Sequence, residues 1–129
     1  MARTRIMYVE CKTGLNDDGP AWIGRVTFSK SGHTVYFNGM ALRRNGGQGI
    51  AGNYRDVLTG EEYWVSGVKK DGEDRHWAGT GKVQIDANVV AEYLAIIGRD
   101  MLDATRLAVC HDIVETDVRK FHEIENRPQ

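Results

Sequence analysis

The alternation of hydrophobic and polar residues predicts a series of short β-strands over the first two-thirds of the chain. Residues 3–11 (RTRIMYVEC) mix apolar side chains with charges at both ends, as a strand with one buried face would. Residues 21–29 place Trp22, Gly24, Val26 and Phe28 on one face. Further strands are predicted at residues 33–37, 40–43, 54–58, 61–66 and 82–85. Asn38-Gly39 predicts a two-residue type I′ turn, because this dipeptide accepts the positive φ that both positions require.

The periodicity changes to helical spacing near residue 86. Asp86 is a suitable N-cap, and apolar residues then recur at three- and four-residue spacing until Gly98. From Arg99 a second helical stripe is predicted, formed by Leu107, Cys110, Val114, Val118, Phe121 and Ile124. The expected fold class is therefore α+β: a strongly curved antiparallel sheet or small β-barrel with C-terminal helices. We expect a β-rich core with a closing helix at residues 1–98 and a C-terminal helical extension at residues 99–129.

Composition and charge limit the classes of function. The 129 residues are 41% hydrophobic and 27% charged, as in an ordinary soluble globular protein, and the formal net charge of −1 argues against a chain that mainly coats phosphate backbones. The two cysteines, Cys11 and Cys110, are far apart in the sequence and indicate no disulfide framework. We find no signal peptide and no membrane-spanning stretch, so a cytoplasmic protein is expected.

Three stretches of sequence carry a resemblance to a known group of proteins. They are TRIMYVE at 4–10, GPAWIGRVTFSKSG at 19–32 and NYRDVLTGEEYWVSGVKKDG at 53–72. Over residues 4 to 97 the chain resembles a group of small uncharacterised bacterial proteins that often carry the label 1-deoxy-D-xylulose-5-phosphate synthase. The resemblance implies a shared fold and transfers no catalytic residue. An enzyme of that name uses thiamine diphosphate and is several times longer, so we expect neither that activity nor a cofactor.

The best candidate site is the charged loop that follows the strand at 61–66. Lys69, Lys70 and Arg75 supply hydrogen-bond donors that would bind an anion or a partner, and the tryptophans that flank the loop supply flat apolar surface. The alternative is a hydrophilic hairpin end in which Asp71-Gly72 makes the turn. The predicted binding residues of this loop are Trp64, Lys69, Lys70, Asp71, Arg75, His76 and Trp77.

Two weaker candidates are a phosphate loop and a metal site. Arg43 and Arg44 precede four glycines within residues 44–53, which would let backbone amides approach a phosphate, although the spacing matches no phosphate-binding motif. A plain flexible loop is the alternative. Asp71, Glu73, Asp74 and His76 could supply metal ligands, but neighbouring cations already neutralise this loop, and we expect no metal. Cys110 lies on the apolar stripe and is interpreted as an inert buried thiol.

Three hypotheses of function follow from these residues. The leading one is a non-enzymatic protein-binding module of adaptor or inhibitor type, such as an immunity protein, that acts through the aromatic and charged loop. The second is a small barrel for single-stranded nucleic acid, and the third is a metal-dependent hydrolase or nuclease that uses the acidic residues of the loop. For the second, the expected base-stacking residues are Trp22, Tyr36, Tyr54, Tyr63 and Trp64. A homodimer is also expected, with the C-terminal stripe at its interface.

Overall fold

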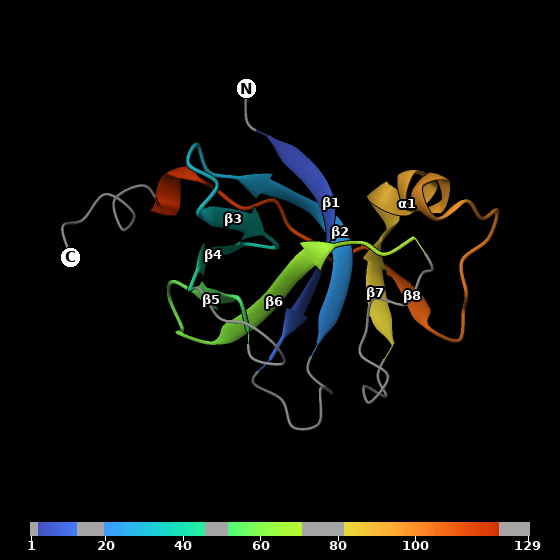
Figure 1. Cartoon of the computed structure of the whole chain (residues 1–129), viewed down its shortest axis with the longest axis horizontal. Helices are drawn as coiled ribbons and strands as arrows, with labels where there is room; N and C mark the ends of the chain where they lie inside the picture. The colour runs from blue at the N-terminus through green and yellow to red at the C-terminus, as the bar shows by residue number, and fades with distance from the viewer. Residues whose placement is uncertain (1–2, 13–19, 46–51, 71–81, 122–129) are drawn as a thin grey trace.

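Eight strands and a short helical segment make up the computed structural model, which describes residues 3–12, 20–45, 52–70 and 82–121. The element order is β-rich throughout, and the α-helix lies between the last two strands (Figure 1). The elements are β1 (Thr4–Cys11), β2 (Ala21–Phe28), β3 (Thr34–Phe37), β4 (Met40–Arg44), β5 (Tyr54–Asp56), β6 (Glu62–Gly67), β7 (Val83–Asp86), the 3-10 turn η2 (Ala87–Val89), α1 (Val90–Ile97) and β8 (Leu107–Cys110).

Six of the strands close into an antiparallel barrel. The sheet runs in the order β1-β6-β5-β4-β3-β2, and an additional antiparallel pairing of β1 with β2 closes it. The closing pair is long, with seven residue pairs between Thr4↔Thr27 and Glu10↔Ala21. Closure leaves no free edge among these six strands, which is how small all-antiparallel sheets avoid an exposed ladder. The predicted small β-barrel is confirmed.

Strand β2 belongs both to the barrel and to a second, parallel arrangement. Its C-terminal half pairs with β3 at Thr27 and Phe28, whereas its N-terminal half pairs in parallel with β7 at Trp22 and Ile23. Strand β8 then adds in parallel to β7. The extension therefore begins where β2 turns away from β3, and β8 forms its outer edge (Figure 1).

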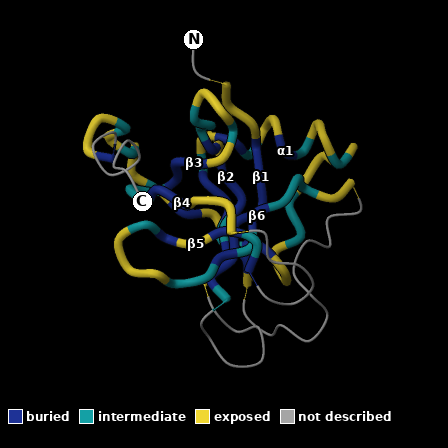
Figure 2. Tube along the Cα trace, turned by 60° about the vertical axis from the view of Figure 1, so that its left-hand side comes forward, coloured by how far each residue is buried: buried dark blue, intermediate teal, exposed yellow. Residues whose placement is uncertain are grey.

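The two faces of β1 and β2 serve two different hydrophobic cores. Along each strand, every second residue, such as Met7 and Val9 of β1 and Val26 of β2, fills the barrel interior. The residues between them, such as Ile6 of β1 and Ile23 of β2, face β7, β8 and α1 and form a second core. The buried residues of both cores lie along the central strands, and exposed residues lie along the outer loops (Figure 2). This explains why β1 reads as a nearly continuous apolar run rather than a strict alternation.

The predicted turn and cap residues adopt the expected local geometry. Asn38 and Gly39 have φ values of 49° and 77°, as a type I′ turn requires. Asp86 caps the turn that leads into α1 by accepting a hydrogen bond from the Asn88 backbone N–H at 3.0 Å. Gly98 ends the helix in the left-handed region at φ 68°.

The prediction of a continuous helix from Arg99 is wrong for the described residues. Leu107–Cys110 is the strand β8, and residues 111–117 contain no regular element before a helical turn begins at residue 119. The apolar residues of the stripe repeat at helical spacing, but they contact different parts of the molecule. Leu107 packs in the second core, Ile113 against the barrel core, and Phe121 against Tyr36. Tertiary contacts, including the pairing that β7 offers to β8, override the local period.

Residues 111–121 form a strap across the barrel, which we call the C-terminal strap. Figure 1 shows it, in red, passing from the β7–β8 side of the molecule to the β3–β4 side. The β3–β4 turn fastens it through two hydrogen bonds. Val114 N–H donates to Asn38 Oδ1 at 3.1 Å, and Gly39 N–H donates to Thr116 Oγ1 at 2.8 Å. The described residues of the predicted stripe, apart from the exposed Val114, are thus at least partly buried within their own chain, and the homodimer stays a prediction.

Candidate functional site

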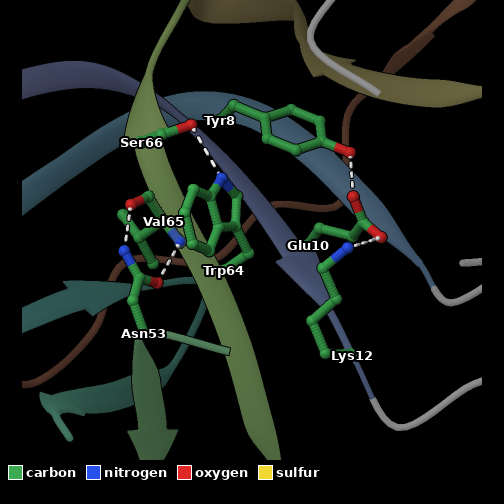
Figure 3. A network of polar contacts seen from close by, with 7 residues as sticks. All are labelled: Tyr8, Glu10, Lys12, Asn53, Trp64, Val65 and Ser66. Atoms are coloured by element: carbon green, nitrogen blue, oxygen red, sulfur yellow. Dashed lines mark hydrogen bonds and ion pairs between the residues drawn. The ribbon is translucent and has the colours of Figure 1, made fainter. Parts of the chain in front are cut away.

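The outer face of the β1–β6 pair carries a group of polar side chains linked by hydrogen bonds and an ion pair. Because side chains alternate along a strand, Tyr8 and Glu10 of β1 lie on the same face, and Lys12 follows with the same parity. The antiparallel register sets Tyr8 opposite Ser66 and Glu10 opposite Trp64 of β6. Figure 3 shows these side chains gathered on one side of the two strands. We call this group the Glu10 cluster: Tyr8, Glu10, Lys12, Trp64 and Ser66.

Glu10 is the centre of this cluster and is almost completely buried. The residue is 1% exposed. Its Oε1 accepts a hydrogen bond from the Tyr8 hydroxyl, and its Oε2 lies 3.0 Å from Nζ of Lys12 (Figure 3). The Lys12 side chain is only 10% exposed, so the pair is a buried ion pair rather than a surface one. Such a pair costs desolvation energy that its mutual attraction only partly offsets, so an apolar pair would serve packing as well.

Trp64 is fixed beside this ion pair. Its indole Nε1–H donates to Ser66 Oγ at 3.2 Å, and the ring packs against the second core without becoming fully buried. Strand β6 is held on both sides at this level. Val65 N–H donates to Asn53 Oδ1 at 2.8 Å, and Asn53 Nδ2 donates to the Val65 carbonyl at 2.9 Å (Figure 3). The indole is therefore a partly exposed aromatic group on a rigid strand.

The other predicted binding residues of the loop are only partly described. Lys69 and Lys70 are exposed and follow directly after the end of β6. Asp71, Arg75, His76 and Trp77 lie outside the described residues, as do Glu73 and Asp74. Trp64 lies in the middle of β6, and Lys69 and Lys70 lie five and six residues further along the chain, after the strand has ended at Gly67. The predicted loop site therefore remains a prediction.

Arg43 and Arg44 do not join this group. Both are exposed at the end of β4, where Arg43 pairs with Arg55 and Arg44 with Tyr54 across the sheet. Tyr54 in turn pairs with Tyr63 of β6, so Arg44 of β4 is level with Tyr63 and two strands away from it. Lys69 is six residues further along the chain than Tyr63. At about 3.3 Å per residue, this separation is on the order of 20 Å along the strand. The two basic pairs are separate surface features.

Tyr8, Glu10 and Lys12 were not among the residues predicted from the sequence. A usable signal was present in the strand at 3–11, because period-two alternation places Glu10 on the same face as Ile6 and Tyr8. A carboxylate on an otherwise apolar face predicts a buried charge with a partner. Lys12, two residues further on the same face, is that partner.

A second buried polar group lies within the barrel, at Tyr63 and Cys11. The two residues are opposite each other in the β1–β6 register, and the Cys11 thiol lies 4.0 Å from Glu61 Oε2. Burial raises the pKa of the Tyr63 phenol, and the nearby Cys11, Glu61 and Asp56 raise it further. The structure thus favours the neutral phenol.

Replacing Tyr63 by Phe is expected to reduce the loss of stability in alkaline solution. Because the folded-state pKa is raised, Tyr63 keeps its proton when the unfolded chain loses it. Stability is fully present below the ordinary tyrosine pKa of about 10 and falls as the pH rises above it. The free energy of unfolding of the wild type and of Tyr63→Phe is measured with urea between about pH 8 and 11. Below about pH 9 the two curves of free energy against pH should be parallel, and above about pH 10 the curve of Tyr63→Phe should fall less steeply. Parallel curves over the whole range would contradict the assignment.

The structure gives less support to the hypotheses of a nucleic-acid-binding barrel and of a metal-dependent hydrolase or nuclease. Tyr36, Tyr54 and Tyr63 are buried, and Trp22 packs edge-on against Phe37, so these aromatic rings do not form an exposed base-stacking surface. No group of three metal-ligating side chains forms among the residues that the structure describes. Cys110 is buried, and burial, with Asp112 and Asp86, raises the pKa of its thiol.

Comparison with known proteins assigns no family. No protein-family model matches the chain, and no curated protein or solved structure matches it. Within the described residues, no helix has the length and apolar character needed to cross a membrane.

Proposed function

We propose that the chain is a cytoplasmic protein-binding module, of adaptor or inhibitor type, that engages its partner through the face around Trp64, Lys69 and Lys70. The observation that carries the proposal is the position of Trp64. Its indole is anchored by Ser66 and by packing against the second core, remains partly exposed, and lies on the strand that ends next to two exposed lysines.

This combination is typical of the residues that dominate protein interfaces. Binding hot spots are enriched in Trp, and they lie in the middle of a patch whose rim is polar. An aromatic side chain that is already fixed loses little conformational entropy on binding. The lysines favour an acidic partner surface, because complementary charge accelerates association and excludes basic competitors. The partner we expect therefore offers an apolar pocket for the indole with carboxylates beside it.

The test is a charge reversal at this face with a matched control. The variant Lys69→Glu/Lys70→Glu should bind a partner captured from the native cell at least about tenfold more weakly than the wild type, because two attractive contacts become repulsive. Arg43→Glu/Arg44→Glu makes the same change of charge at the end of β4 and should bind within about threefold of the wild type. Binding is measured by titrating the purified partner. Equal affinities for wild type and Lys69→Glu/Lys70→Glu would contradict this face as the interface.

Single-stranded nucleic acid is expected not to change the tryptophan fluorescence of the protein. The tyrosines that a stacking groove would need are buried, and Trp22 is packed against Phe37. Titration with single-stranded DNA and RNA at low salt measures this, because stacking on Trp quenches its emission. Quenching that weakens steeply as the salt concentration rises would favour the nucleic-acid hypothesis instead.

A further inference from the structure

Strand β8 is the open edge of the extended sheet. It pairs with β7 through Val83↔Leu107 to Asp86↔Cys110, and no further strand pairs with it among the described residues. Val109, in the middle of β8, is 47% exposed. Proteins usually shield edge strands with charges, bulges or covering segments, because an unpaired ladder recruits another strand. An apolar, half-exposed residue in the middle of an edge is therefore a place where another strand can add.

The backbone of β8 is oriented for such pairing. Val83 N–H donates to the Arg106 carbonyl at 2.9 Å, which sets the phase of the parallel ladder. In a parallel pair alternate residues turn both backbone groups toward the neighbouring strand, so Arg106, Ala108 and Cys110 face β7. Leu107 and Val109 turn theirs toward the open edge. The Leu107 N–H is satisfied locally by the Asp103 carbonyl at 2.9 Å, so the groups of Val109 lie at the centre of the exposed ladder.

Exposed apolar side chains are concentrated in the same part of the chain. Five large hydrophobic residues are exposed among those that the structure describes, and three of them, Ile96, Met101 and Val109, lie between the end of α1 and the end of β8. A second interacting surface in this region is consistent with that distribution. It is separate from the Trp64 face, because β7, β2 and β1 lie between β8 and β6 in the sheet.

The residues around Val109 are complementary to their own copy. In an antiparallel pairing centred on Val109, two outward-facing Val109 residues meet and exchange both backbone hydrogen bonds. Extended one residue before β8 and two residues after it, the same register places Arg106 of one copy opposite Asp112 of the other, twice by symmetry. Both residues are exposed, and Arg106 also forms an ion pair with Asp103, with Nε 3.7 Å from Oδ2. Opposite charges at directly opposed positions stabilise such a pair.

We infer that β8 pairs with the β8 of a second copy of this chain, antiparallel about Val109, to form a twofold-symmetric dimer. Charge complementarity selects a second copy over an unrelated strand, because the Arg106–Asp112 match arises only when the sequence meets itself. The dimer is independent of the proposed function, since it uses neither Trp64 nor the lysines after β6. An interface of this size is small, and a dissociation constant in the micromolar range is expected.

Two measurements on the wild-type protein test the dimer. Sedimentation between about 1 and 200 μM should show a monomer converting to a dimer, as a micromolar dissociation constant requires. Hydrogen exchange should show the Val109 amide becoming protected as the protein concentration rises, because its N–H faces the open edge and enters the new ladder. The Ala108 amide, which faces β7, should exchange at the same rate at both concentrations.

Charge reversal tests the register. Arg106→Glu alone places two carboxylates opposite each other at both symmetric positions, and Asp112→Arg alone places two cations there. Each exposed pair changes an equilibrium constant by up to about fivefold, so either variant should dimerise about tenfold more weakly than the wild type. An equimolar mixture of the two variants should restore wild-type affinity. In the heterodimer the introduced glutamate of one chain lies opposite the introduced arginine of the other, and the unchanged Asp112 and Arg106 lie opposite each other. Native mass spectrometry distinguishes the heterodimer from both homodimers.

The results of these measurements either support or overturn the β8–β8 dimer and its register. A heterodimer that forms more tightly than either variant alone supports the self-pairing and its register, and loss of folding cannot imitate this rescue. A wild-type protein that stays monomeric at about 200 μM, with a Val109 amide that exchanges freely, overturns the dimer and leaves the edge for a strand of another protein. A dimer that neither variant weakens overturns the pairing about Val109.

Discussion

Replacing Glu10 by Leu is expected to lower the free energy of unfolding by about 3–5 kcal/mol. The substitution removes the carboxylate opposite the Lys12 ammonium, whose side chain is only 10% exposed. A buried charge that loses an opposite charge 3.0 Å away keeps its desolvation cost, and breaking one side of a buried pair typically has this effect. Lys12→Leu should be comparably destabilising, because it leaves the carboxylate of Glu10 in the same buried position. Urea denaturation measures both values.

The double variant Glu10→Leu/Lys12→Leu separates the ion pair from the rest of the site. Its stability should lie within about 1.5 kcal/mol of the wild type, because removing both charges together leaves neither uncompensated. The exposed pair Arg55–Glu62, at 3.7 Å with side chains 56% and 42% exposed, is the control, and Glu62→Gln should change stability by less than about 1 kcal/mol. A double variant as unstable as Glu10→Leu would show that the hydrogen bond from Tyr8, rather than Lys12, gives Glu10 its importance.

Replacing Phe121 by Ala is expected to cost about 3–5 kcal/mol and to release the C-terminal strap. Phe121 is fully buried, and its ring lies 6.3 Å from that of Tyr36, measured between centroids, and packs beside Ala41. Removing a buried Phe loses its transfer free energy and leaves a cavity. Denaturation by urea measures the cost. Val118, which is only partly buried at the same place, provides the control, and Val118→Ala should cost about 1 kcal/mol.

A second measurement shows whether the strap itself has detached. The Gly39 N–H donates to Thr116 Oγ1 within the strap, so its hydrogen exchange should accelerate in Phe121→Ala and remain slow in Val118→Ala. If the Gly39 amide stays protected while stability falls, Phe121 fills a cavity without holding the strap. A cost below about 1 kcal/mol would contradict the burial of Phe121.

The barrel strands could be predicted because each carries its own local signal. Asn38-Gly39 specifies a two-residue turn with positive φ at both positions, and it fixes the register of β3 against β4. Tyr63 and Val65 of β6 are buried and alternate with partly exposed neighbours, as the predicted period of two requires. These features depend on residues close together in the sequence, so the amino-acid pattern alone determines them.

Strand β8 could not be predicted in the same way. Its four residues, Leu107–Cys110, are too few to establish a period of two, and Leu107 and Cys110 also fit helical spacing. They form a strand because β7 offers them an edge to pair with. That edge exists because β7 itself pairs in parallel with β2 on its other side. Short parallel strands depend on a partner that is distant in sequence, and no local pattern reports that partner.

The candidate site was predicted in part. Trp64, Lys69 and Lys70 were proposed because aromatic and basic residues occur together in this part of the sequence, and their role in binding stays a prediction. Glu10 and Lys12 were missed because their importance comes from burial, which follows from the second core that covers the outer face of β1. Arg43 and Arg44 were grouped with the glycines that follow them, and because residues 46–51 lie outside the described residues, the phosphate loop stays a prediction. The position of a charged residue in the sequence does not show on which side of the barrel that residue lies.

The division of β2 between two sheets has a consequence for how the chain folds during synthesis. All six barrel strands lie before residue 68, so the barrel can close before β7 and α1 leave the ribosome. Until then Ile6, Tyr8 and Ile23 have no cover on the outer face. At about 5–20 residues per second, the roughly thirty residues from β6 to the end of α1 take about 2–6 seconds to emerge. Over that interval the nascent barrel presents an apolar strip that a chaperone can bind, and the strip disappears when β7 docks against β2.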